Sequence, residues 1–514
     1  MHFKLPALRP SLLLPDVTAS LVVFLVAVPL CVGVAVASGV PAELGLITGI
    51  VGGLVAGVLP GSSLQVSGPA AGLTVLVHEA VEAHGLAALG VIVLASGVLQ
   101  LVLGAARCGR WFRAISIAVV QGMLAGIGLV LILGQAYAMA DLTAPSSGLG
   151  KISGLPGLTR DIVFSADALV TFMVGTATIA VLILWKRLPG PLPHVLPAPL
   201  ATVALATAAV AALGLPIARV DVQGLIESVQ PPALGALSNL GDVALLGTVL
   251  AFTLIASAES LFSAAAVDRM HDGPRTDYDK ELMAQGVGNT VCGLLGALPM
   301  TAVIVRSAAN VQAGARTKLS RVLHGVWLLL FAALFPAALE AIPIAALAGV
   351  LVHAGAKLMP VRELLPLWRD HRGEAVVLAV TAIAIVVTNM FEGVLLGLLM
   401  AVAKTAWETS SLHVHVEDGA AGPIHVRITG NATFLRLPRI LDTLEALPGD
   451  RPVQLDLSRL RHLDHACHTA LTGWAVWHNK SNNEPVQVKI PDDVPQLGTG
   501  PGNPHPKSVT HRQL

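Results

Sequence analysis

Charged side chains are scarce in this chain. Asp, Glu, Lys and Arg make up 12% of its 514 residues, whereas 54% of the residues are hydrophobic and the mean hydropathy is +0.74. No soluble core is this apolar over such a length, so the composition indicates a polytopic membrane protein. An excess of charge of one sign is also missing, because the formal net charge is zero. This balance argues against a nucleic-acid partner.

Cysteine clusters and a cleavable leader are missing as well. The four cysteines lie far apart with no CxxC pair, which argues against a disulfide framework and a cysteine metal site. No nucleophile and base pair and no metal triad stands out, so we expect no enzyme activity, no cofactor and no metal. The first residues, MHFKLPALRPSLLLPD, lack a cleavage site and lead directly into an apolar segment. We therefore expect a cytoplasmic lead-in.

What the chain does have is a long series of apolar runs, in two sets of seven. In both sets the third run is too short to cross about 30 Å of hydrocarbon, and it begins next to a proline. Paired short, broken segments in corresponding positions indicate a transporter's binding site between inverted repeats. The sequence thus predicts a polytopic α-helical protein with fourteen spans as 7+7 inverted repeats, and short broken helices 3 and 10. The runs are 17–38, 43–59, 69–82, 86–104, 114–136, 168–186 and 195–214, then 243–267, 280–297, 301–313, 320–337, 341–358, 374–390 and 391–407.

The positions of Lys and Arg give an independent test of topology. With the N-terminus inside, most loop Lys and Arg residues fall on the cytoplasmic side, and the outside loops hold only Lys151, Arg160 and Arg219. Cytoplasmic loops of membrane proteins are enriched in these residues. We therefore expect a multi-pass protein of the cytoplasmic membrane with both termini in the cytoplasm.

The second short segment, within residues 298–320, carries a cation. Its Pro-Met-Thr opening leaves Thr301 placed to cap a helix that starts at Ala302, and Arg306 follows within about 7.5 Å along such a helix. Helical side chains lean toward the N-terminus, so the guanidinium of Arg306 is expected near the unpaired N–H groups of its own helix. Together they predict an anion site.

A cation in the middle of a bilayer needs a partner. Glu259, within run 243–267, is the only other ionisable residue at similar depth in this half of the chain. One interpretation is an ion pair between Glu259 and Arg306 that only holds the bundle together. The other, which we favour, is functional, because charges inside membranes usually mark transport pathways.

The composition changes near residue 410. Alternating β-branched runs are followed by two helical patterns and two further strands, which predicts a small soluble α/β domain with β-α-β-α-β order over 411–490. After residue 490 the chain is rich in Pro and Gly, and we expect residues 491–514 to be a disordered tail.

Three stretches in this order resemble the SulP family of anion transporters, whose membrane domain is followed by a STAS domain. They are VSGPAAGLTVLV at 66–77, ASAESLFSAAAVDRM at 256–270 and LPMTAVIVRSAANVQAGARTKLS at 298–320. The resemblance covers essentially the whole chain. It implies a transmembrane domain over 1–410, with a core (1–110 and 243–340) and a gate (111–242 and 341–410). It also implies elevator-like movement of the core and a homodimer.

The resemblance also implies a substrate site between the broken third and tenth helices. An acidic residue and a hydroxyl one turn later, here Glu259 and Ser263, would lie beside the substrate and couple it to a cation. The two share a helix face, and an apolar slot disfavours a charged carboxylate, which favours H+ over Na+. The backbone and side chains implied for the anion are those of Ala70, Ala71, Gly72, Thr301, Ala302, Val303 and Arg306.

Other polar residues have simpler interpretations. Gln65, Ser67 and Thr74 line the site or bond neighbouring helices, and we expect Asn310 to orient Arg306. The STAS-like region departs from its family, because Asp464 is followed by His, Ala and Cys where regulatory relatives have a phosphorylatable serine. It also ends early, near residue 490.

These observations favour a secondary active transporter of a small inorganic anion such as sulfate or bicarbonate, coupled to H+. A C4-dicarboxylate symporter on the same fold stays open, since dipoles and one arginine recognise charge better than identity. A passive anion channel is the alternative from another class, and Glu259 argues against it. A nucleobase transporter would be expected to show carboxylates on helices eight and ten, whereas the tenth has Arg306.

Overall fold

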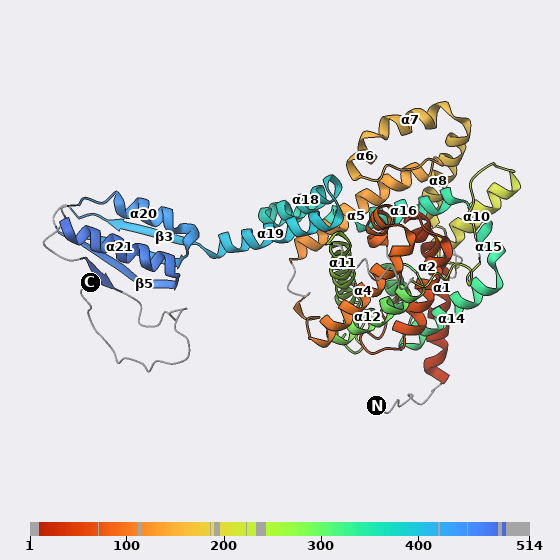
Figure 1. The fold of residues 1–514 in the computed structure, drawn as a ribbon, viewed down its shortest axis with the longest axis horizontal. Coiled ribbons are helices and arrows are strands. Elements are labelled where there is room, and N and C mark those ends of the chain that lie inside the picture. Colours follow the sequence, from red (N-terminus) through yellow and green to blue (C-terminus); the bar gives the residue numbers. More distant parts are fainter. Residues whose placement is uncertain are drawn as a thin grey trace. The chain divides into compact units, whose positions relative to one another are not determined.

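The computed structural model divides the chain into two compact units, residues 1–398 and 399–514 (Figure 1). It describes residues 10–69, 71–111, 116–185, 187–189, 196–222, 224–232, 243–419, 422–449, 451–481 and 486–489. The expected tail at 491–514 lies outside the described residues.

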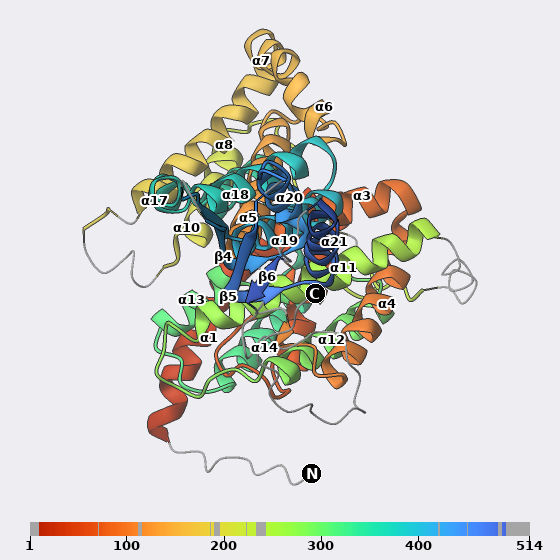
Figure 2. The same ribbon diagram turned by 90° about the vertical axis from the view of Figure 1, so that its left-hand side faces the viewer.

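The first unit is built almost entirely of helices, seen from a second side in Figure 2. Each predicted apolar run contains at least one of them. Within the described residues, seven helices are long and apolar enough to cross a membrane alone. The helices of the first half are α1 (Pro10–Ala37), α2 (Ala42–Val51) with the π-helix η1 (Gly52–Ala56), the 3-10 helix η2 (Ala71–Leu73), α3 (Thr74–His84), α4 (Leu86–Ala105), α5 (Ile117–Ala138), α6 (Gly148–Ser153), α7 (Leu155–Phe164), α8 (Ala166–Trp185) and α10 (Ala198–Ala212).

The second half repeats this succession of long and short helices. Four short helices, α6, α7, α15 and α17, were not predicted, because they lie wholly or mostly in the loops between the predicted apolar runs. The helices are α11 (Val243–Val267), α12 (Tyr278–Leu294), α13 (Ile304–Gln312), α14 (Leu319–Leu334), α15 (Pro336–Glu340), α16 (Ile344–Leu358), α17 (Val361–Asp370), α18 (Arg372–Val387) and α19 (Met390–Thr409).

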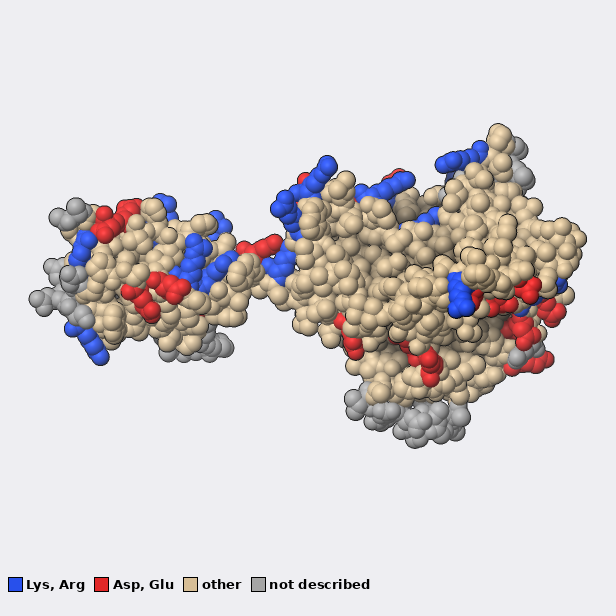
Figure 3. All heavy atoms as spheres, turned by 90° about the horizontal axis from the view of Figure 1, so that it is seen from above, with Lys and Arg blue, Asp and Glu red and all other residues tan. Residues whose placement is uncertain are grey.

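Glycines let the central helices pack closely. Helix α4 lies along α12 and α11, and its Gly97 touches the backbone of α12: a Cβ at Gly97 would be 2.4 Å from the backbone N of Thr290. In return, a Cβ at Gly293 of α12 would be 2.3 Å from the backbone N of Leu94. Small residues at helix contacts are how membrane helices approach one another. Figure 3 shows broad areas of this unit's visible face without charged side chains, as a lipid-facing surface requires.

The second unit has a four-stranded sheet in the order β3-β4-β5-β6. Strands β3 (Leu412–Glu417) and β4 (Ile424–Ala432) are antiparallel, whereas β4 pairs in parallel with β5 (Val453–Leu463), and β5 with β6 (Gln487–Lys489). The 3-10 helix η5 (Phe434–Arg436) with α20 (Leu437–Glu445), and α21 (His465–Ser481), connect the parallel strands. The first predicted strand is therefore a pair of antiparallel strands, and the order is β-β-α-β-α-β.

The start of α21 has no hydroxyl group, as the sequence indicated. Asp464 accepts a hydrogen bond from the Cys467 backbone N–H (2.7 Å) and another from the Phe434 N–H (2.5 Å). The Cys467 side chain is fully buried in the core of the unit. Burial and the neighbouring Asp464 raise the pKa of the Cys467 thiol to about 12. The thiol is therefore protonated and unreactive at neutral pH.

Candidate functional site

Two short strands cross at the centre of the first unit. Strand β1 (Ser67–Pro69) pairs antiparallel with β2 (Met300–Ala302), and Gly68 lies opposite Thr301. Each strand leads into a short helix, α3 after β1 and α13 after β2. Because the strands run in opposite directions, the two helices leave the pair at opposite ends. Both predicted broken segments therefore exist, and each is a strand followed by a half-length helix.

The second broken segment corrects the expected start of its helix. Helix α13 begins at Ile304, two residues later than predicted, and Thr301 lies in β2 and does not cap the helix. The N–H groups of Ala302 and Val303 already have protein acceptors, Ser260 Oγ (3.2 Å) and the Val66 carbonyl (2.9 Å). The expectation that these two N–H groups are open to an anion is therefore wrong. The first-turn N–H groups without an intrahelical acceptor are those of residues 304–306.

Arg306 lies fully buried against the first broken segment. Its Nη2 donates to the Pro69 carbonyl at 3.4 Å, and a Cβ at Gly68 would be 2.2 Å from its Nη1. The guanidinium therefore reaches across to β1, beyond the start of its own helix. Its Nε and Nη1 are buried and find no oxygen or nitrogen acceptor among the described residues, although the Cys31 thiol lies beside the guanidinium. Burying a cation whose donor nitrogens lack acceptors costs free energy. A bound anion would supply the missing acceptors.

Glu259 faces the same segment a turn further on. A Cβ at Gly72 would lie 2.8 Å from Glu259 Oε1, so the backbone of η2 packs directly on the carboxyl group. Glu259 Oε2 and Ser263 Oγ are buried without a hydrogen-bond partner in the described chain, and the Thr301 hydroxyl lies beside the Glu259 carboxyl group. Ala71 and Gly72 form the first turn of η2, whereas Ala70 lies outside the described residues.

No ion pair joins Glu259 to Arg306 in the part of the chain that the structure describes. The purely structural interpretation of the two charges required such a pair. Instead, both groups keep open polar atoms, and each contacts the backbone of the first segment separately. The residues between these two contacts, 69–71, include the start of η2.

The remaining polar residues hold the crossing in place. Gln65 donates to the Ser260 carbonyl (2.8 Å) and Ser67 accepts from Gln285 (2.8 Å), so both bond neighbouring helices. Thr74 Oγ1 is buried without a partner among the described residues. Asn310 donates to the Leu64 carbonyl at 2.9 Å, so the prediction that it orients Arg306 is wrong.

Sequence analysis missed two residues of α12, Gln285 and Asn289. Gln285 bonds Ser67 in β1, and Asn289 bonds both backbone groups of Met300 in β2. Two amide side chains four residues apart share a helix face, and this spacing was the available signal.

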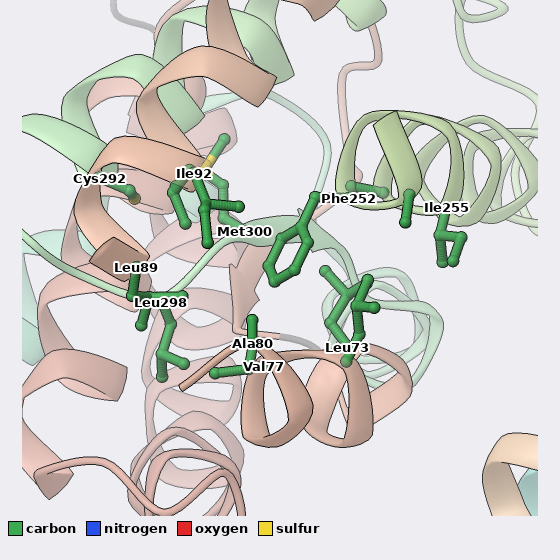
Figure 4. Packing of buried hydrophobic residues seen from close by; sticks show 14 of the residues in the cluster. Leu73, Val77, Ala80, Leu89, Ile92, Phe252, Ile255, Cys292, Leu298 and Met300 are labelled. Atoms are coloured by element: carbon green, nitrogen blue, oxygen red, sulfur yellow. The ribbon is translucent and has the colours of Figure 1, made fainter. Parts of the chain in front are cut away.

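Apolar side chains enclose the crossing on the side of α3 and α11. Figure 4 shows Leu73 and Val77 of the first segment packed with Phe252 and Ile255, and Met300 of β2 in the same cluster. Such surroundings strengthen every electrostatic contact to a bound ion, because they exclude water.

Comparisons with known proteins agree with this architecture. A model of the sulfate permease family matches residues 13–381. A putative sulfate transporter of Bacillus subtilis, YvdB, is 27% identical over 388 residues, covering 75% of this chain and 72% of the relative. The bicarbonate transporter BicA of Picosynechococcus sp. is 28% identical over 367 residues, covering 67% of this chain and 61% of the relative.

Solved structures show the fold independently. The transmembrane domain of a cyanobacterial BicA matches with a TM-score of 0.64 at 22% identity, covering 78% of this chain and 98% of that domain. The murine anion transporter Slc26a9 matches with a TM-score of 0.74 at 16% identity, over 95% of this chain and 86% of its own. The protein is therefore a multi-pass α-helical membrane protein, and the chain belongs to the sulfate permease family.

Proposed function

We propose that the protein is a secondary active transporter that moves a small inorganic anion of the sulfate or bicarbonate type. The observation that carries this proposal is Arg306, fully buried with two open donor nitrogens against the backbone of β1. A desolvated guanidinium next to helix N-termini favours an oxyanion over any neutral solute. The names of the relatives, sulfate and bicarbonate transporters, support the same class of substrate.

The anion would lie between the two broken segments. From the first segment, residues 70–72 would supply N–H groups at the start of η2 and α3. From the second, Thr301 would supply a hydroxyl beside Glu259, and Arg306 the charge. Because the N–H groups of Ala302 and Val303 are occupied, those two residues would shape the site, and the donors would come from residues 304–306.

The helix contacts support fourteen spans in two inverted repeats. When each helix is replaced by its counterpart at the same position in the other set of seven runs, the pair α2 and α14 becomes α12 and α4. The same exchange turns α1 and α14 into α11 and α4, and α5 and α18 into α16 and α8; all six contacts occur in the structure. Elevator-like movement of a core (1–110 and 243–340) against a gate (111–242 and 341–410) would then alternate access to the anion site.

Coupling to H+ would involve Glu259 and Ser263. Glu259 Oε2 has no partner in the described chain, so a proton there costs no existing hydrogen bond. Sodium is the competing ion, and Thr301 Oγ1 favours it as a third buried oxygen beside those of Glu259 and Ser263. In both cases the coupling group contacts Gly72 of the segment that would bind the anion.

The C-terminal unit would serve dimer contact or folding, with both chain ends in the cytoplasm. Its sheet and two helices fit the STAS-like region expected at 411–490. A phosphorylation switch at the start of α21 is not proposed, since Asp464 is followed there by His465.

Reconstitution would test the transport proposal directly. Purified protein in liposomes would be offered labelled sulfate, bicarbonate or fumarate under an imposed pH gradient, an imposed Na+ gradient, or none. Saturable uptake of sulfate or bicarbonate driven by the pH gradient is the expected result. Selective fumarate uptake would make the protein a C4-dicarboxylate symporter. Anion flux indifferent to both gradients would make it a passive channel.

A further inference from the structure

Strand β2 has one edge paired and one edge turned away from β1. Thr301 lies opposite Gly68, and the next residue of the same edge, Val303, donates to the Val66 carbonyl. Since backbone groups alternate sides along a strand, those of Met300 and Ala302 point away from β1. Inside a membrane protein such an open edge must find partners, because no water is there to bond it.

Asn289 of α12 supplies those partners for Met300. The Met300 N–H donates to Asn289 Oδ1 at 2.7 Å, and Asn289 Nδ2 donates to the Met300 carbonyl at 3.0 Å. This is the two-bond exchange that a neighbouring strand would make. A side-chain amide is suited to it because it carries a donor and an acceptor side by side. The N–H of Ala302, the other outward residue, bonds Ser260 of α11.

Buried polar side chains of α4 and α11 fix the orientation of the Asn289 amide group. Its Nδ2 also donates to Gln100 Oε1 of α4 at 2.8 Å. Gln100 Nε2 then donates to Ser257 Oγ at 3.0 Å, and Ser257 donates to the Thr253 carbonyl at 2.5 Å. Asn289 is 1% exposed, and Gln100 and Ser257 are 0% exposed. Both N–H donors of the Asn289 amide are used and its Oδ1 accepts the Met300 N–H, so this amide has one orientation.

We propose that Asn289 is a positioning residue for the anion site. It does not face the anion; it holds Met300, the residue before Thr301, and through β2 it sets where Thr301 and the start of α13 stand relative to β1. The role rests on the proposed function, since it matters for transport only if the anion binds at the crossing. Gln285, one turn earlier on α12, bonds Ser67, so the same helix face contacts both strands.

The test measures anion binding by the purified full-length protein, using labelled sulfate and labelled bicarbonate in equilibrium dialysis. Asn289→Leu should weaken binding about tenfold or more per folded molecule, because it leaves the Met300 groups unpaired and lets β2 shift. Thr290→Val is the matched control, since among the described residues its hydroxyl donates to the Gly286 carbonyl of its own helix alone. It should keep wild-type affinity.

A second variant covers the case in which Asn289→Leu does not fold. Gln100→Met leaves the Met300 bonds in place but frees the Asn289 amide, and we expect about threefold weaker binding. The double variant should bind no more weakly than Asn289→Leu alone, because both residues act through one chain of hydrogen bonds. A purely structural role predicts a lower melting temperature with unchanged affinity.

The outcomes separate the two proposals. If wild type and Thr290→Val bind sulfate or bicarbonate, and folded Asn289→Leu or Gln100→Met binds equally well, the positioning role is overturned and the transport proposal stands. If the wild type binds neither anion saturably, the proposed function is overturned, and the positioning role with it. Weakened binding in both variants with an intact control supports the role.

Discussion

The two broken segments differ in what they bring to the crossing. The first, β1 with η2 and α3, brings glycines at 68 and 72 and no charged side chain near the strand pair. The second, β2 with α13, brings Arg306. Arg306 and Glu259 of α11 both contact the first segment: Arg306 packs on Gly68, and Glu259 packs on Gly72. The neutral segment is thus the common surface on which the anion and the coupling ion would meet.

This division has a physical reason. A backbone can approach a guanidinium or a carboxyl group closely only where no Cβ intervenes. The residues that contact these two groups are therefore glycines. If both segments carried charged side chains, the pairing of β1 with β2 would hold those charges next to each other whether or not an anion was bound. With one segment neutral, the cation and the carboxyl group stay apart, and no ion pair between them forms in the described chain.

The largest effect is expected from removing the charge of the second segment. Arg306→Ala should abolish saturable anion uptake while the protein still inserts, because the site then keeps backbone dipoles and the Thr301 hydroxyl but no positive charge. Arg306→Lys should restore it only partly, because a point charge replaces a planar fork with several donors. Uptake in liposomes, normalised to protein amount, is the measurement. Unchanged apparent affinity in Arg306→Ala would show that the anion binds elsewhere.

Glu259→Gln should separate binding from coupling. The amide keeps the shape of the carboxyl group but can neither lose nor gain a proton near neutral pH, so the anion should still bind while uptake stops following a pH gradient. The experiment compares uptake with and without an inward pH gradient in wild type and variant. A pH-driven uptake that persists in Glu259→Gln would exclude Glu259 as the proton site. Wild-type uptake driven by a Na+ gradient at constant pH would identify Na+ as the coupling ion.

The two glycines offer a matched comparison on the neutral segment. A Cβ at Gly68 would be 2.2 Å from Arg306 Nη1, and one at Gly72 would be 2.8 Å from Glu259 Oε1. Gly68→Ala should therefore weaken anion binding, by about tenfold if the guanidinium must shift by a bond length. Gly72→Ala should mainly alter the response to the ion gradient. Equal effects of both variants on affinity and coupling would mean that the two charges share one site.

The position of the two broken segments can be predicted from the sequence, but their pairing as strands cannot. The prolines, the short third run of each repeat and the lone Arg306 predicted two broken segments and an anion site, because helix length and charge burial are local properties. The strand pair was missed because three residues are too few to show alternation. Because residues 300–302 pair with β1, Thr301 lies in a strand and does not cap α13. The bonds from Ser260 and Asn289 to β2 join residues distant in sequence, and only packing brings them together.

The smallest effects should come from two serines that each serve one segment. Ser260 accepts the Ala302 N–H of the second segment, and Ser307 accepts the Val66 N–H just before the first strand (2.9 Å). Changing either to alanine leaves one buried N–H unpaired, at a cost of about 1–3 kcal/mol in the free energy of unfolding. If anion binding depends most on the placement of the segment that carries Arg306, Ser260→Ala should also weaken anion binding severalfold, because Ala302 leads directly into α13. Ser307→Ala should weaken it less, because Val66 is joined to the crossing by β1, which has its own bond from Gln285 to Ser67. Thermal unfolding and anion titration of both variants would decide this, and a larger loss of affinity in Ser307→Ala would reverse the roles assigned to the two segments.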